Sequence, residues 1–323
     1  MESLPIVLMM GLLCAGGCRT PLVCADDLPA ADNVLPCSQS AGRGAERQHI
    51  LRVDTPQASQ PDPALQPTHR ASRFFRSWSR MAEHAQATEP DWLSPVATTS
   101  GRLKQEFRYD VWRQTTPSGA TNYIFGGGKG LELIVAPRLQ ILIGVPSYVV
   151  HTPSGPRDGF GDTPLMLTFR LASAPRGEGD YLLTLLISAT VPTGSQALGM
   201  HDAVLSPGIA FGKGWGRFDV QSTLGANLPT GGTSRLGRQF LWNTAFQYRA
   251  SRMLWPELEV NSTSFLTGKN AGETQVYLTP GLGFGRAHLW RTLRFSAAVG
   301  FETAATQFHT YNHQWILSNR FTF

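Results

Sequence analysis

The last fourteen residues of the chain, TYNHQWILSNRFTF, alternate between two kinds of side chain. Counting back from Phe323 in steps of two gives mainly aromatic and aliphatic residues, among them Phe321, Leu317 and Trp315. The positions between them are largely polar, as Arg320 illustrates. Because successive side chains of a strand point to opposite faces, this period of two predicts a long ribbon with one apolar and one polar surface.

The same period continues back to about residue 96. In 101–113, Leu103 and Phe107 lie on one predicted face and Lys104 and Glu106 on the other. Twelve such stretches of roughly 10 to 14 residues are each long enough to cross a bilayer when tilted. The predicted strands are 101–113, 121–136, 139–150, 160–171, 181–191, 203–211, 218–228, 239–249, 254–266, 274–286, 289–301 and 310–323.

The connections between these stretches alternate in length. Tight turns are predicted near Pro137, Gly214, Ser251 and Ala287. Longer connections rich in Gly, Pro, Ser and Thr are predicted at 152–158, 192–200, 229–236 and 267–272. Hydrocarbon cannot satisfy a free strand edge, so a sheet in lipid must close on itself. The sequence therefore predicts an all-β protein, a single closed antiparallel transmembrane β-barrel of about 12 strands, at residues 96–323.

The amino-terminal region has a different composition. A short apolar core at 4–13, followed by Val23, Cys24 and Ala25, predicts a signal peptide over 1–25. A lipoprotein-type signal at Cys18 and a wrongly assigned start codon are alternatives. Residues 26–95, rich in Ala, Pro, Gln, Ser and Arg, predict a disordered periplasmic extension. Within it, 70–81 is either a partly ordered linker, the preferred interpretation, or a short helix that touches anionic lipid.

The polar face of the predicted strands would line the lumen. One interpretation is a charged wall that orients polar solutes in a channel, and the other is a set of cross-strand ion pairs that plugs the lumen. Glu106, Arg108 and Asp110 begin this face. The predicted lumen-lining residues are Arg102, Lys104, Glu106, Arg108, Asp110, Glu132, Arg217, Asp219, Gln239, Asn243, Arg249, Glu257, Glu259, Asn261, Arg294 and Arg320.

Other chemistry finds little support in the sequence. The net charge of +5 shows no basic stripe for nucleic acid. Single histidines such as His309 and His313, on or before a strand, lack the geometry of a metal site. Ser195 and Ser206 are possible nucleophiles of a lipid-modifying enzyme, but no ordered His, Ser and Asn set is found. The run GGGKG at 126–130 is interpreted as a bulge or mobile loop, not as a phosphate loop.

Several short motifs, in this order, resemble a known family. They are EPDW at 89–92, GRLKQE at 101–106, GFGDTPLMLTFR at 159–170, VPTG at 191–194 and LSPGIA at 205–210. Together they resemble the MetA-pathway of phenol degradation family of outer-membrane transporters, over roughly residues 89–323. The resemblance implies an outer-membrane pore or carrier and supplies no catalytic residues and no established substrate.

The ending FTF also resembles the closing strand of bacterial outer-membrane barrels. That resemblance implies that Phe321 and Phe323 form an insertion signal for the barrel-assembly machinery. The prediction is thus a passive channel or transporter for small compounds, including aromatic or hydrophobic ones, in the outer membrane of a Gram-negative-type bacterium. Outer-membrane lipid and a small-molecule solute would be its partners, with no nucleic acid, cofactor, metal or catalytic residue. The alternatives are an outer-membrane lipid-modifying enzyme and a structural barrel with a salt-bridge-plugged lumen.

Overall fold

A computed structural model describes residues 67–127, 129–152, 157–196, 198–290 and 292–323. All of these lie in the compact unit Asp62–Phe323. The predicted signal peptide at 1–25 and the predicted extension as far as residue 66 lie outside the described residues.

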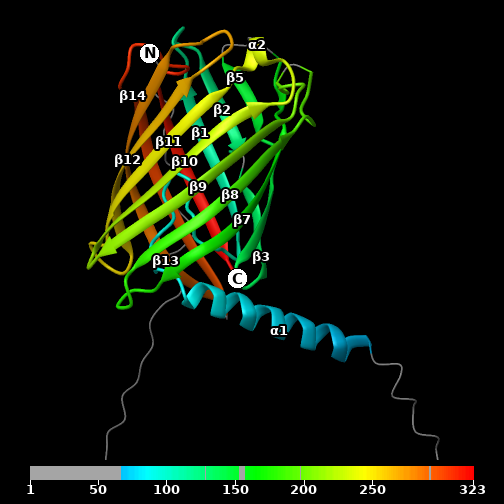
Figure 1. The fold of residues 1–323 in the computed structure, drawn as a ribbon, viewed down its shortest axis with the longest axis vertical. Helices are drawn as coiled ribbons and strands as arrows, with labels where there is room; N and C mark the ends of the chain where they lie inside the picture. Colours follow the sequence, from blue (N-terminus) through cyan, green and yellow to red (C-terminus); the bar gives the residue numbers. More distant parts are fainter. Residues whose placement is uncertain (1–66, 128, 153–156, 197, 291) are drawn as a thin grey trace, which may run out of the picture. The chain divides into compact units, whose positions relative to one another are not determined.

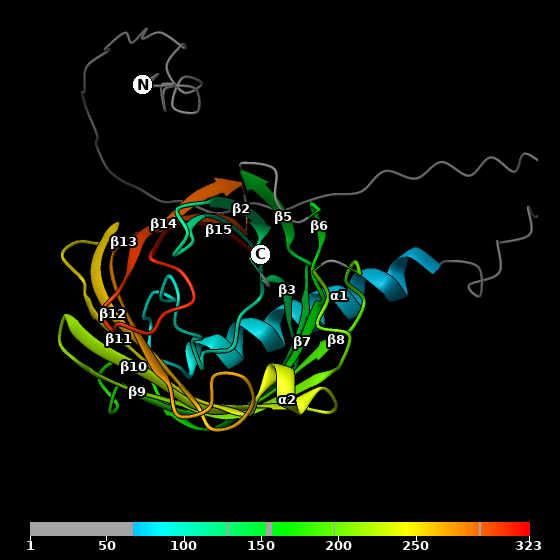
Figure 2. The same ribbon diagram turned by 90° about the horizontal axis from the view of Figure 1, so that it is seen from above.

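Fifteen strand segments form one antiparallel sheet that closes into a barrel (Figures 1 and 2). Closure joins the first segment to the last through ten residue pairs, from Glu106↔Thr322 to Thr115↔His313. The segments are β1 (Glu106–Thr115), β2 (Thr121–Gly126), β3 (Gly130–Ala136), β4 (Leu139–Gly144), β5 (Tyr148–Thr152), β6 (Gly159–Phe160), β7 (Thr163–Ala174), β8 (Tyr181–Val191), β9 (Val204–Trp215), β10 (Phe218–Pro229), β11 (Gln239–Tyr248), β12 (Leu254–Phe265), β13 (Thr274–Trp290), β14 (Leu293–Ala304) and β15 (His313–Thr322).

Three pairs of segments each follow a single path across the wall, so the fifteen segments make twelve wall strands. The pairs are β2 with β3, β4 with β5, and β6 with β7. One register runs through β4 and β7 at Leu139↔Phe169 and continues through β5 and β6 at Tyr148↔Phe160. Both β2 and β3 pair with β1. The twelve strands predicted from the period of two are confirmed.

The break between β2 and β3 is a bulge. Two residues separate Phe107 from Asp110 on β1, whereas four separate their partners Leu131 and Gly126. The extra length requires glycine at Gly127, whose φ is 57° and whose added Cβ would lie 2.8 Å from the Cβ of Asp110. The bulge predicted for GGGKG therefore brings this part of the wall close against β1.

The two faces of the wall differ as the alternation predicts. Outward positions carry exposed aromatic and aliphatic side chains along every part of the barrel, such as Phe169, Trp242 and Trp315. Inward positions carry buried polar and charged side chains, such as Asp110 and Glu259. An apolar exterior around a polar interior is the inverse of a soluble sandwich and is the arrangement of a transmembrane barrel.

Loop lengths distinguish the two ends of the barrel. Turns at 137–138 and 216–217 are short, whereas the connections between β8 and β9 and between β10 and β11 are long, and the latter contains α2 (Thr233–Leu236). The first and last strands both have their free ends at the short-turn end (Figure 1). This end faces the periplasm in barrels of this class, and the chain is an outer-membrane β-barrel.

The region before the barrel departs from the predicted disorder. Residues 67–87 form the helix α1 (Pro67–Ala87), and 88–95 are ordered and largely buried. The Nε1 of Trp78 donates to the carbonyl of Ile134, 2.6 Å away, and Ala82 and Ala85 pack against Ile134 and Leu103. The helix is held by contacts with β3 and with the chain after it, which a local composition argument cannot detect. Within the described part of the chain, α1 included, no helix is both long and apolar enough to span a membrane.

Candidate functional site: a luminal segment and its chambers

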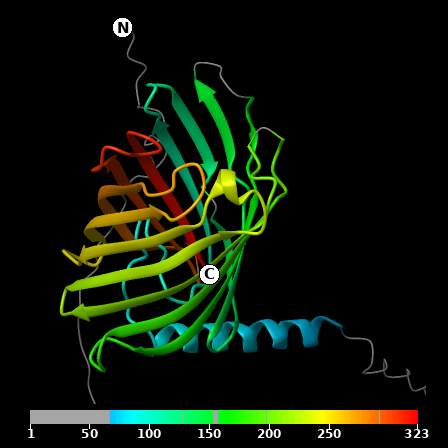
Figure 3. The same ribbon diagram turned by 45° about the horizontal axis from the view of Figure 1, so that its top comes forward.

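Residues 88–105, here called the luminal segment, lie inside the ring of strands (Figures 2 and 3). The segment enters from α1 and leaves into β1, both at the short-turn end. Most of its residues are buried, including apolar Leu93 and Val96 and polar Ser100. A stretch with this much buried backbone must find hydrogen-bond partners in the wall around it.

Two carboxylates of β12 hold the tip of the luminal segment. The backbone N–H of Val96 donates to Glu257, 3.2 Å away. The N–H groups of Ala97 and Thr98 donate to the two oxygens of Glu259, at 2.9 and 2.5 Å. Because Glu257 and Glu259 are two apart on one strand, both side chains point inward at neighbouring heights. They act as acceptors for three consecutive backbone donors.

Two arginines hold the carbonyls of the same tip. Arg320 of β15 donates to the carbonyls of Ser94 and Pro95, at 2.5 and 2.8 Å. Arg108 of β1 donates to the carbonyl of Val96, at 2.5 Å, and is itself paired with Asp110 at 2.8 Å. Both arginines are about 1 % exposed. The wall therefore supplies cations to the carbonyls and anions to the N–H groups of one loop.

The base of the luminal segment is fixed by a second group. Glu89 pairs with Arg170 of β7 at 3.0 Å and accepts the backbone N–H of Leu103 at 3.0 Å. Burial raises the pKa of Glu89 to about 7, against the opposing effect of Arg102 and Arg170. Lys104 lies 3.5 Å from Glu132 and 3.6 Å from Glu106. These contacts join the two ends of the segment to each other and to the wall.

The structure places the sequence-predicted lumen residues in three environments. Glu106, Arg108, Asp110, Glu132, Asp219, Glu257, Glu259 and Arg320 are buried wall residues, while Arg102 and Lys104 are buried in the luminal segment, not in β1. Gln239, Asn243 and Asn261 are half-buried toward the long-loop end, where the amide of Asn227 donates to Gln239. The remaining three lie at the short-turn end: Arg294 is exposed, Arg217 is exposed in a turn, and Arg249 lies 5.5 Å over the ring of Trp255.

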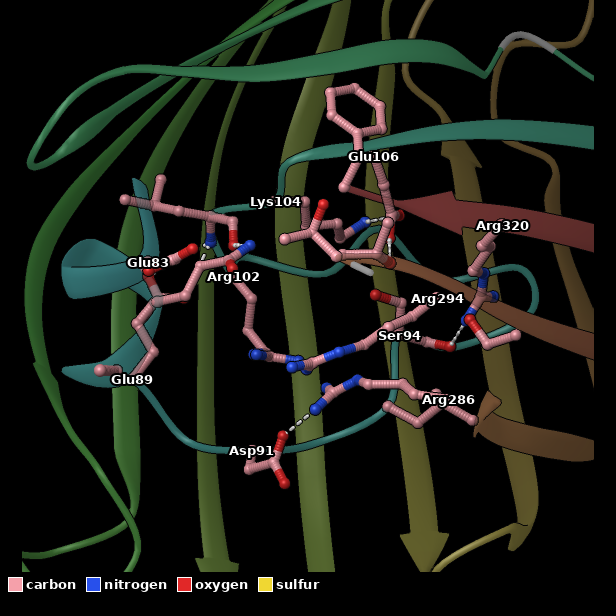
Figure 4. Close-up of a pocket in the computed structure, with 18 of the residues that line it drawn as sticks. Glu83, Glu89, Asp91, Ser94, Arg102, Lys104, Glu106, Arg286, Arg294 and Arg320 are labelled. Atoms are coloured by element: carbon pink, nitrogen blue, oxygen red, sulfur yellow. Dashed lines mark hydrogen bonds and ion pairs between the residues drawn. The ribbon is translucent and has the colours of Figure 1, made fainter. Parts of the chain in front are cut away.

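A chamber of about 610 Å³ lies below the luminal segment at the short-turn end (Figure 4). Figure 4 shows Arg102, Arg286 and Arg294 pointing toward one another from three different elements. Arg286 pairs with Asp91 and donates to the carbonyl of Trp92 at 3.2 Å. Burial and the nearby charge of Arg286 lower the pKa of Arg102. The chamber is therefore rich in guanidinium groups.

Two further chambers lie on the other side of the luminal segment. One, of about 290 Å³, is bordered by Val96 and Ala97 of the tip and by Trp112, Tyr277 and Tyr311. The rings of Tyr277 and Tyr311 are stacked with centroids 4.3 Å apart. The other chamber, of about 130 Å³, shares Leu241 and Asn243 with the first and touches Thr99. The luminal segment thus separates the lumen into a short-turn compartment and a long-loop compartment.

The described residues offer little for catalysis. None of their Ser hydroxyls is hydrogen-bonded to a His ring, and His309 instead contacts Thr306 and Asn312, each at 2.9 Å. Across the ranges that the structure describes, no group of three or more His, Cys, Asp or Glu residues could hold a metal ion. The polar groups of the lumen mainly bind the luminal segment.

Sequence reasoning missed several of the residues that build this site. Glu89, Asp91 and Arg286 were not singled out, although 89–92 was noted for its motif. Gln140 and Gln221 were also missed. Their amides bind the luminal segment, Gln140 accepting from Lys104 N–H and Gln221 donating to the Leu93 carbonyl at 3.0 Å. Both glutamines occupy inward-facing positions in the alternation of a predicted strand, and this position was the signal that could have identified them.

No protein-family model and no curated protein matches the sequence. Solved structures similar to this chain include an outer-membrane channel from Pseudomonas putida F1, with 13% identity, a TM-score of 0.49, and 72% of this chain and 100% of that chain covered. The NanC porin follows with 8% identity and a TM-score of 0.45, covering 67% and 98%. The KdgM porin has 8% identity and a TM-score of 0.41, covering 68% and 99%.

Proposed function

We propose that the protein is a passive outer-membrane channel for small solutes, in which the luminal segment forms the barrier. The observation that carries this proposal is the division of the lumen. Chambers of about 610 and 290 Å³ lie on opposite sides of residues 88–105. A barrel that served only as an anchor would need neither chamber. Displacing one loop would join the two compartments without disturbing a wall strand.

The distribution of charges favours this proposal over a structural barrel closed by wall-to-wall ion pairs. Glu257, Glu259, Arg108 and Arg320 bind backbone groups of the luminal segment, as described above. Among the described residues, the only ion pair with both members on wall strands joins Arg108 to Asp110 on one strand. The lumen is closed by a loop bound through hydrogen bonds, which individually contribute little net stability.

The solute class follows from two further considerations. The resemblance to the MetA-pathway of phenol degradation family suggests aromatic compounds. The long-loop compartment presents Trp112, Tyr277 and Tyr311, whose rings provide apolar surface within a polar lumen. We include small aromatic compounds in the proposal on this basis.

Conductance measurement tests the channel. The purified full-length protein is reconstituted in planar bilayers, and uptake of small solutes is followed in liposomes. We expect small, discrete conductance steps and solute entry. Absence of both, with the barrel shown to be folded by its resistance to unfolding in detergent, would overturn the proposal.

Membrane lipid is the proposed partner of the exterior and of α1. Phe74 and Phe75, 65 % and 59 % exposed, belong to the amino-terminal half of α1. Figure 2 shows that this end of the helix extends beyond the ring of strands. Exposed Arg73 and Arg80 flank them. Apolar rings beside arginines on a helix that lies crosswise to the barrel suit the headgroup region of the periplasmic leaflet.

The carboxyl-terminal strand is the proposed contact with the barrel-assembly machinery. The side chain of Phe323 is 44 % exposed beyond β15, and the ring of Phe321 lies 5.2 Å from that of Phe295. Replacing Phe323 with Ser should lower the amount of folded protein in the outer membrane, measured by heat-modifiable migration on gels. An unchanged folded fraction would contradict this role.

A further inference from the structure

We infer that the short-turn chamber holds a binding site for a small oxyanion, built by Arg102 and Arg294, with Arg320 at its border. This site would bind a phosphate or carboxylate group between the luminal segment and the ends of β14 and β15. A role of this site in transport rests on the proposed channel function, whereas binding of the anion does not require that the protein conducts.

The first observation is a pair of buried guanidinium groups without counter-ions. Arg102 and Arg320 are 8 % and 1 % exposed. Among the described residues, neither has a carboxylate oxygen within 4.0 Å. Buried charges in folded proteins are ordinarily paired, because an unpaired one loses its hydration without compensation. Both arginines border the same chamber.

The second observation is a set of unused donors. The Nε of Arg102 is buried and has no hydrogen-bond partner, while its Nη1 donates to the carbonyl of Trp92. Arg294, exposed at the mouth of the chamber, has no hydrogen bond or ion pair within the described ranges. Guanidinium groups present several N–H donors in a fixed plane that matches the oxygens of phosphate and carboxylate.

The third observation concerns the carboxylates that share the chamber. Glu89 pairs with Arg170, Asp91 with Arg286, and Glu106 with Lys104. Glu83 accepts from the hydroxyl of Ser79 at 3.3 Å, on the helix α1. These acids thus have other partners, and among the described residues none of them lies within 4.0 Å of the guanidinium groups of Arg102, Arg294 and Arg320.

Arrangement completes the argument. Figure 4 shows Arg102, Arg286 and Arg294 converging on the same space from the luminal segment, β13 and β14. Like charges that converge repel one another, and a bound anion would relieve that repulsion. The chamber, at about 610 Å³, is large enough for a small organic acid as well as for inorganic phosphate.

The test is calorimetric titration of inorganic phosphate into the full-length protein in detergent. We expect saturable binding by the wild type, weakened about tenfold by Arg294→Gln, which removes one charge-assisted contact. Arg294 is exposed and holds no part of the luminal segment, so this variant should fold. The matched control is Arg217→Gln, which removes an exposed arginine at the same end but outside the chamber. Arg102→Gln should also weaken binding, and only if its unfolding midpoint shows a folded barrel does its result count.

Competition distinguishes the ligand chemistry. Acetate, which presents a carboxylate, should displace phosphate, whereas chloride at equal ionic strength should displace it poorly. Displacement by chloride equal to that by acetate would overturn the assignment of an oxyanion site. So would the absence of saturable binding, or an equal loss of affinity in Arg294→Gln and Arg217→Gln. A protein that binds phosphate but conducts nothing would support the anion site and contradict the proposed channel. A protein that conducts but does not bind phosphate would support the channel and contradict the anion site.

Discussion

The two halves of the lumen are built from different chemistry. The short-turn half contains charged side chains that grip the luminal segment, with Arg108 and Arg320 buried almost completely. The long-loop half contains mainly amides, hydroxyls and aromatic rings around a chamber, with Lys129 and Glu302 among the few charged residues that line it. The charged side chains of the short-turn half thus mainly hold backbone, whereas charged side chains are a minority among the residues that line the long-loop chamber.

This difference teaches how a polar interior should be interpreted. A charged inward face predicts a hydrated wall, but buried charges here bind a chain segment in place of water. At the short-turn end, Arg102 and Arg294 have no carboxylate at ion-pair distance among the described residues, and this is the charge that we propose to be available to a ligand. Experiments can test separately which charged residues hold the luminal segment and which bind a ligand.

Removing the luminal segment should have the largest effect. Replacing residues 89–103 with a Gly and Ser linker of the same length deletes most of the side chains of the luminal segment and leaves a flexible chain. We expect single-channel conductance to rise several-fold as the two compartments join. The control is the same exchange in the long loop 230–238. Equal conductance in the wild type and the linker variant would show that the segment is no barrier.

The base of the segment should respond to pH through Glu89. The pKa of Glu89 is raised from 4.5 in the unfolded chain to about 7 in the fold. The native state therefore binds this proton more tightly, so its stabilising contribution is complete below pH 4.5 and is lost as the pH rises through 7. The loss is about 3 kcal/mol of opening free energy. Hydrogen exchange at Leu103, compared between pH 5 and 8, measures it.

Glu89→Gln is the control for this pH effect, because the amide cannot ionise. In that variant the exchange at Leu103, corrected for intrinsic rate, should lose its dependence on pH. A dependence that persists unchanged would assign the titration to another group.

Loss of one acceptor at the tip should have a smaller effect. Glu259→Ala leaves the N–H groups of Ala97 and Thr98 without their acceptor, which we expect to cost about 2 kcal/mol of local stability. Hydrogen exchange at these two amides would quicken accordingly. Glu273→Ala, at an exposed site in a long loop, should leave them unaffected. No change in Glu259→Ala would mean that the carboxylate is not what holds the tip.

The smallest effect is expected outside the lumen, on α1. Phe74→Ser combined with Phe75→Ser removes two exposed rings that we place at the lipid surface. In nanodiscs containing anionic phospholipid, amides at 73–77 should exchange about threefold faster in the variant than in the wild type. Amides at 81–85, which pack against the barrel, should not change. Equal rates at 73–77 in discs would argue against lipid contact.

The wall could be predicted from the sequence because its signal is local. A period of two assigns each side chain to a face whatever its partner, so the inward position of Glu257 or Arg320 follows from parity alone. The first strand shows the limit of that reasoning. Arg102 and Lys104 share the parity of Glu106, yet the strand begins at Glu106 and the two residues belong to the luminal segment. The alternation of side chains does not show at which residue backbone pairing with the neighbouring strand begins.

The luminal segment itself could not be predicted, for a physical reason. Its contacts are with residues far away in the chain, such as Val96 with Glu257 and Thr223 with Thr99. Residues 88–100 contain Pro, Ser and Thr and no periodic apolar face, as a linker does. Its order comes from the closed wall around it. Likewise α1 was treated as part of a disordered extension because its partner Ile134 lies in a distant strand.

The luminal segment enters and leaves the barrel at the same end, with Glu89 near Leu103 at its base. Such a loop enters the lumen from one end and does not pass through the barrel. It can withdraw and return through the opening by which it came, without passing either terminus through the pore and without parting β1 from β15. In the channel that we propose, the pathway would therefore open without separating wall strands, and the hydrogen bonds at the tip would oppose that opening.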